Sequence, residues 1–201
     1  MISINIRDLK TQLQNSKKII VIPHKNPDGD AIGSCVAINE LLKSLGHKSS
    51  IISPNNFPDF LKWMDKEHEI NIYENNPELY NNEILSSDII FTLDFNSLSR
   101  IGSMGEIVND SNALKIMIDH HQNPENYANY TYSDVNMSST CEMVFHFIAE
   151  LSLNDKINSK IASALYTGIM TDTGSFKFPL TTSVTHKVVS ELIKKGFAYE
   201  N

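Results

Sequence analysis

The sequence predicts an α/β fold, with a mostly parallel sheet flanked by helices. Three short apolar runs rich in β-branched residues are typical of buried strands: Lys18–Pro23, Asp88–Leu93 and Leu114–Ile118. Segments with helical spacing of apolar residues alternate with these runs, as in successive β-α-β units. Polar residues follow each run at once, which is where the carboxyl edge of a parallel sheet presents ligand-binding side chains.

The first half of the chain alternates helical and extended segments. Apolar residues at helical spacing predict a helix within Asn5–Asn15, and a broad apolar face predicts a longer one over Asp30–Leu45. Gly46 follows this longer helix as its stop signal. Weaker signals predict strands at Ser49–Ser53 and Ile70–Tyr73 and a short helix at Pro58–Lys66.

The second half of the chain contains three further helix signals. Ser139 and Glu142 have the spacing of a capping box, and an apolar face continues from there to Leu151. Helical spacing also predicts helices at Ile157–Met170 and Ser183–Lys195. These helices complete the alternation on which the fold class depends.

Composition excludes several classes of protein. The 201 residues suit one domain or little more, and no apolar run approaches the roughly 20 residues of a membrane helix. A net charge of −7 argues against gripping long nucleic acid by a basic face. The N-terminus lacks signal-peptide features, so we expect a cytoplasmic protein. Cys35 and Cys141 are expected to be buried free thiols.

Side chains of metal-ligand type concentrate after the predicted strands. They are His24, Asp28, Asp30, Asp94 and His120, and Asp172 is added just after the helix predicted at Ile157–Met170. Between the first three, Pro27 fixes φ and Gly29 permits unusual backbone angles, so a tight loop can present three ligands. So many carboxylates at one edge of a sheet would repel one another without cations.

The size of this ligand set predicts two cations and a reaction class. Two imidazoles and four carboxylates exceed the needs of one ion and suit two octahedral ions that share a bridging carboxylate. Mixed nitrogen and oxygen ligands favour Mn²⁺, with Mg²⁺, Co²⁺ or Fe²⁺ as alternatives. Two ions about 3.5–4 Å apart clamp a phosphoester and activate water. We therefore expect phosphoester hydrolysis by metal-activated water.

Four motifs carry a resemblance to a known family. They are HKNPDGDAIGS (24–34), LDFNSLSRIG (93–102), IDHHQNP (118–124) and YTGIMTDTGSF (166–176). Together they resemble the DHH phosphoesterases, and the first motif is similar to the nanoRNase branch, often labelled exopolyphosphatase-related. The resemblance implies hydrolysis of short oligoribonucleotides and of 3′-phosphoadenosine 5′-phosphate (pAp).

The resemblance also implies how the metal ligands divide. His24 and Asp28 would hold one cation, and Asp94 would bridge it to the other. The second cation would take Asp30, His120 and Asp172.

Further roles follow for residues around the metals. His121 would act beside the scissile phosphate as an acid or electrostatic stabiliser, and Asp119 would orient a ligating histidine. Arg100 would approach a substrate phosphate, while Ser139 and Thr140 would start a helix whose N-terminus faces that phosphate.

The resemblance suggests a domain organisation as well. Residues 1–196 would form the DHH domain, and residues 197–201 would begin a linker to a C-terminal DHHA1-type domain that this chain lacks. Because that domain grips the substrate, we expect weak activity from this chain alone. The expected partners are short RNA oligomers or nucleotide monophosphates, with a homodimer possible.

Two alternatives remain open at this point. An inorganic pyrophosphatase or exopolyphosphatase would use similar metals, although Gly29 stands where family II pyrophosphatases have Thr. A non-catalytic metal- or nucleotide-binding module would hydrolyse nothing with any divalent ion.

Overall fold

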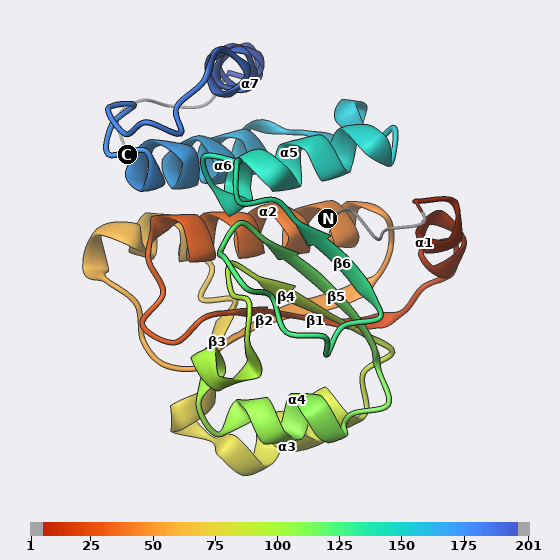
Figure 1. The fold of residues 1–201 in the computed structure, drawn as a ribbon. Helices are drawn as coiled ribbons and strands as arrows, with labels where there is room; N and C mark the ends of the chain where they lie inside the picture. Colours follow the sequence, from red (N-terminus) through yellow and green to blue (C-terminus); the bar gives the residue numbers. More distant parts are fainter. Residues whose placement is uncertain (1–5, 197–201) are drawn as a thin grey trace.

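The computed structural model describes residues 6–196, which form one parallel sheet covered by helices on both faces (Figure 1). Within this range the sheet has six strands in the order β3-β2-β1-β4-β5-β6, and every neighbouring pair is parallel. The strands are β1 (Lys18–Pro23), β2 (Lys48–Ser53), β3 (Ile70–Ile72), β4 (Ile89–Leu93), β5 (Leu114–Asp119) and β6 (Tyr130–Ser133). The predicted fold class is therefore confirmed.

Helices form layers above and below the sheet. Figure 1 shows α2, α5 and α6 over one face, α3 and α4 under the other, and α7 outermost beyond α5 and α6. The helices are α1 (Ile6–Gln12), α2 (Gly29–Ser44), α3 (Pro77–Leu85), α4 (Met104–Asp110), α5 (Thr140–Glu150), α6 (Ser159–Asp172) and α7 (Ser183–Ile193). Short 3₁₀ helices add Asp59–Asp65, Tyr73–Asn75, Leu98–Ile101 and Asn154–Lys156.

Each face of the sheet has its own hydrophobic core. Along β1, Ile19 and Val21 face the core under α2, α5 and α6, while Ile20 and Ile22 face the core over α3 and α4. This alternation of apolar residues explains why the strand is a continuous apolar run, since both of its faces are buried. The side chain of Phe91 on β4 is likewise fully buried, packed edge-on against an α5 ring.

The order of the strands places a crevice beside β1. The chain runs from β1 through α2 to β2 on one side, and it later returns with β4 on the other side of β1. In open parallel sheets, ligands bind outside the carboxyl ends of the strands where the strand order reverses in this way. The segments that follow Pro23 and Leu93 therefore meet at the favoured position for a site.

The structure adds elements that the sequence did not predict and shifts the ends of others. Helices α3 and α4 and strand β6 were not predicted, because all three are short and much of the surface of the two helices is exposed. Helix α6 starts at Ser159 rather than Ile157, since the Asn158 side chain caps it. Asn5 and residues 197–201 lie outside the described residues, so the predicted linker is not described. Within residues 6–196, no helix combines the length and apolarity needed to cross a membrane.

Candidate metal centre

The loop after β1 and the end of β4 bring together a first group of ligands. The Nε2 atom of His24 lies 3.5 Å from Asp94 Oδ2 and 4.0 Å from Asp28 Oδ1. One ligand atom from each of these three residues falls within 4.8 Å of the others. Asp28 is the exposed member, and it also caps α2 by accepting the amides of Asp30 and Ala31. The first group is therefore open to solvent on its Asp28 side.

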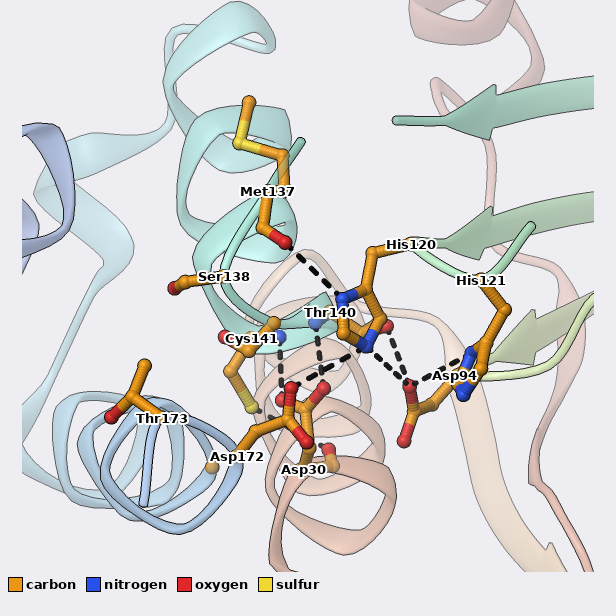
Figure 2. A network of polar contacts seen from close by, with 12 residues as sticks. Asp30, Asp94, His120, His121, Met137, Ser138, Thr140, Cys141, Asp172 and Thr173 are labelled. Carbon is orange, nitrogen blue, oxygen red and sulfur yellow. Dashed lines mark hydrogen bonds and ion pairs between the residues drawn. The ribbon is translucent and has the colours of Figure 1, made fainter. Parts of the chain in front are cut away.

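A second group adjoins the first and comes from three different elements. Asp30 is buried in the first turn of α2, His120 follows β5, and Asp172 ends α6. His120 Nε2 lies 3.5 Å from Asp172 Oδ2, and a ligand atom from each residue falls within 4.8 Å of the others. Figure 2 shows these side chains converging from α2, α6 and the end of β5.

Asp94 lies between the two groups. Its Oδ2 faces His24 of the first group, and its Oδ1 lies 3.7 Å from His120 Nε2 of the second. The residue is 2% exposed and has φ of +66°, a left-handed conformation that is costly for a side chain other than glycine. Such backbone strain is typical of functional sites, and here it turns the carboxylate between the two histidines.

His24 and His120 have the orientation that metal-ligating histidines adopt. His24 Nδ1 lies 2.8 Å from the backbone carbonyl of Lys25, and His120 Nδ1 lies 3.2 Å from that of Met137. A carbonyl only accepts, so each Nδ1 carries the proton of the neutral ring. That tautomer leaves the Nε2 lone pair directed at the carboxylates, which is the arrangement a divalent cation requires.

His121 stands at the edge of the two groups and is held by Asp119. Its Nδ1 lies 2.7 Å from Asp119 Oδ1, and its amide donates to the other oxygen of that buried carboxylate. The hydrogen bond to Asp119 raises the pKa of His121, which favours the protonated ring. Asp119 thus orients His121, and a ligand atom of His121 also falls within 4.8 Å of ligand atoms of Asp94 and His120.

The carboxylates of the centre form a charge cluster that a cation would stabilise. Burial, together with the charges of Asp94 and Asp172, raises the pKa of Asp30 well above its usual range. Burial also raises the pKa of Asp172 to about 6. Burial opposes ionisation of Asp94 too, but contact with His24 and the charges of the other histidines hold its pKa below the ordinary value. A donor set of this kind fits divalent cations.

The N-terminus of α5 anchors the second group. The Thr140 and Cys141 amides donate to the two Asp30 oxygens at 2.6 and 2.8 Å, and the Thr140 hydroxyl donates to Asp94 Oδ1 at 2.9 Å. Ser139 caps this helix by accepting the Glu142 amide. The first turn of α5 therefore binds carboxylates of the protein itself, a contact that spacing alone did not reveal.

Two sequence interpretations of single residues near this helix need correction. The predicted capping box is only half formed, because the Glu142 side chain accepts the Ser138 and Thr185 hydroxyls instead of the Ser139 amide. Gly29 has no unusual backbone angles and is the first residue of α2. A Cβ at Gly29 would lie 2.4 Å from Thr171 Oγ1, so this glycine permits the close approach of α2 to α6.

Arg100 occupies the rim of the centre. It lies exposed on the 3₁₀ helix Leu98–Ile101, and its charge acts against protonation of His121. The Lys25 amide donates to the Arg100 carbonyl at 2.8 Å, which joins this helix to the loop that carries His24. The structure thus brings all six predicted ligands together, with His121, Asp119 and Arg100 around them, while their roles toward metal and substrate stay predictions.

The topology of the sheet and the side chains at its carboxyl edge indicate one kind of chemistry. A parallel sheet that carries adjoining His/Asp groups at its carboxyl edge has the donor set and the position of a metal-dependent phosphoesterase.

Comparison with known sequences narrows that class to a family. The family described as "DHH family, N-terminal domain" matches residues 18–169. The chain belongs to the DHH family of phosphoesterases.

Particular relatives and solved structures show how far the likeness reaches. The bifunctional oligoribonuclease and PAP phosphatase NrnA of Bacillus subtilis is 30% identical over 90% of this chain and 54% of its own length. An exopolyphosphatase-related protein from Bacteroides fragilis matches with a TM-score of 0.93 at 39% identity, over 96% of this chain and 57% of that one. A structure of exonuclease RecJ bound to manganese shares the fold, with a TM-score of 0.58 at 16% identity. The chain thus spans about half the length of these relatives.

Proposed function

We propose that this chain hydrolyses phosphoesters of short oligoribonucleotides and of pAp, using two divalent cations, manganese by preference. The relative NrnA of Bacillus subtilis, whose name describes an oligoribonuclease and PAP phosphatase, supports these substrates. The mixed imidazole and carboxylate donors, together with the manganese in the RecJ structure, support manganese as the metal.

The observation that carries the proposal is the position of Asp94 between two ligand groups. Its Oδ2 faces the Nε2 atom of His24 on one side, and its Oδ1 faces the Nε2 atom of His120 on the other. The exposed Asp28 and half-buried Asp172 complete the two groups on the solvent side. This arrangement supports a pair of ions that a substrate phosphate can reach.

The chain's own residues supply the remaining chemistry. Bound cations would neutralise phosphate charge and activate a water molecule. Protonated His121, oriented by Asp119, donates a hydrogen bond to a phosphate oxygen, or its proton to the leaving-group oxygen, as the P–O ester bond breaks. Arg100 on the rim orients a further phosphate of the substrate by its charge.

The proposal is tested by offering the purified chain three substrates separately with manganese: pAp, a set of di- to pentaribonucleotides, and pyrophosphate. We expect release of phosphate from pAp, of mononucleotides from the oligomers, and little turnover of pyrophosphate. Asp94→Asn, which keeps the shape of the side chain, is the matched control and should be inactive. Turnover of pyrophosphate alone would replace this function with that of a pyrophosphatase, and turnover of none would favour a binding module.

A further inference from the structure

Thr140, which the sequence predicts to lie near a substrate phosphate, donates hydrogen bonds to two carboxylates of the candidate metal centre. Its side chain is fully buried. Its hydroxyl donates to Asp94 Oδ1 at 2.9 Å, and its amide donates to Asp30 Oδ2 at 2.6 Å. One residue thus touches the carboxylate between the two groups and the most buried carboxylate of the second group, and both of its donors are used.

The hydroxyl selects one of the two oxygens of Asp94. That oxygen, Oδ1, faces His120 at 3.7 Å, whereas Oδ2 faces His24 at 3.5 Å. A carboxylate rotates easily about its terminal torsion unless a hydrogen bond fixes it. The Thr140 hydroxyl supplies that bond on the side of the second group, and Figure 2 shows Thr140 beside Asp94, Asp30 and His120.

The backbone of Thr140 is itself held in place. It is the first residue of α5, and the Ser139 side chain caps that helix by accepting the Glu142 amide at 3.0 Å. Glu142 is 2% exposed and accepts the Thr185 hydroxyl of α7 at 3.0 Å. The hydroxyl of Thr140 therefore projects from a fixed helix end, which makes it a precise support for Asp94.

We propose that Thr140 is a positioning residue whose hydroxyl sets the rotation of the Asp94 carboxylate. Cation binding by the second group, Asp30, His120 and Asp172, then depends on the Thr140 hydroxyl more than cation binding by the first group does. This inference rests on the proposed two-cation function. Hydrogen bonds to metal-ligating side chains typically affect metal affinity by 10–100-fold. Cation binding by the first group should be affected less, because its His24 faces the other oxygen of Asp94, Oδ2.

The experiment measures manganese binding to the metal-free chain by calorimetry, comparing Thr140→Val with Thr140→Ser. Valine keeps the shape and removes the hydroxyl, and serine keeps the hydroxyl. Thr92→Val is the matched control, because it removes a buried hydroxyl of β4 that bonds Tyr127 at 2.8 Å instead of a ligand. Thermal unfolding of each metal-free variant checks that it folds.

We expect two binding events in the unaltered chain and in Thr92→Val. In Thr140→Val, one event should weaken by about 10–100-fold while the other changes little, and Thr140→Ser should restore both. A folded Thr140→Val that binds two manganese ions with unchanged affinity would overturn this inference alone. Absence of manganese binding by the unaltered chain would instead overturn the proposed function, and the inference with it.

Discussion

The two ligand groups of the centre are built in different ways. The first takes His24 and Asp28 from one short loop, with Asp94 from the neighbouring strand end. The second takes Asp30 from α2, His120 from the end of β5 and Asp172 from the end of α6, which meet through the packing of the helices on the sheet. A loop with an exposed aspartate tolerates small shifts, whereas a buried group between helices depends on close packing. The second group should therefore be the more sensitive to changes in the core.

The largest effect is expected from the residue that the two groups share. Asp94→Asn removes the negative charge and one acceptor while keeping the size of the side chain, so both cations should be lost and hydrolysis should fall to background. Manganese calorimetry and phosphate release measure the two outcomes. Loss of a single ion would show that the groups are independent and that Asp94 bridges nothing.

His121 lies at the margin of both groups and should separate chemistry from binding. His121→Ala is expected to retain both manganese ions, yet to slow hydrolysis by roughly 10²–10⁴-fold, because the general acid is gone. Steady-state rates beside a binding titration test this. Should manganese binding fall as far as the rate does, His121 would be a ligand.

Close packing of α6 distinguishes the second group from the first. A Cβ at Gly168 would lie 2.2 Å from Cys141 Sγ and 2.9 Å from Asp30 Oδ1. We expect Gly168→Ala to lower the free energy of unfolding by about 1–3 kcal/mol and to weaken binding of one manganese ion. Denaturant unfolding and calorimetry measure these effects.

Gly105→Ala is the matched control for that packing change. Its Cβ would lie 2.5 Å from the Leu98 carbonyl, on the other face of the sheet. A similar loss of stability with normal manganese binding is expected there. Equal loss of manganese affinity in both variants would mean that general destabilisation, rather than the geometry at Asp30, controls the second group.

The smallest effect is expected from Glu142, which lies in the first turn of α5. Burial disfavours the charged form of Glu142, yet contact with His146 and the Ser138 and Thr185 hydroxyls hold its pKa below the ordinary value. The unfolded chain therefore binds the proton more readily, so the stabilisation by Glu142 is present near neutral pH and is lost as the pH falls from about 5 towards 3.

Glu142→Gln should remove that part of the acid dependence and lower the melting temperature of the chain slightly at pH 7. Thermal unfolding between pH 7 and pH 3 for both chains tests it. If the melting temperatures of the two chains fall in parallel over this range, Glu142 contributes nothing to the acid dependence.

The sequence predicted the ligands of both groups, but it did not predict the packing that brings the second group together. His24 and Asp28 come from one loop after a clear strand, and Asp94 follows another, so spacing and strand order sufficed. Asp172 was predicted as a ligand, but its approach to Asp30 depends on the crossing of α2 and α6 at Gly29 and Gly168, which no local pattern encodes. The use of Thr140 as a support was missed for the same reason.

The sequence predicted the central strands of the fold but not its shorter peripheral elements. The central strands β1, β4 and β5 are buried on both faces, and their apolar runs identify them clearly. Helix α3 begins with Pro77 after a capping Asn76, a signal that could have revealed it, but its exposed polar surface hides the helical period. Edge strand β6 has only four residues and owes its conformation to pairing with β5.

Two cations are proposed to bind side by side around Asp94. Anomalous diffraction from crystals of the chain grown with manganese tests it most directly. We expect two manganese peaks about 3.5–4 Å apart, one beside His24 and Asp28, the other beside His120 and Asp172, with Asp94 between them. A single peak, or two peaks that do not share Asp94, would contradict it.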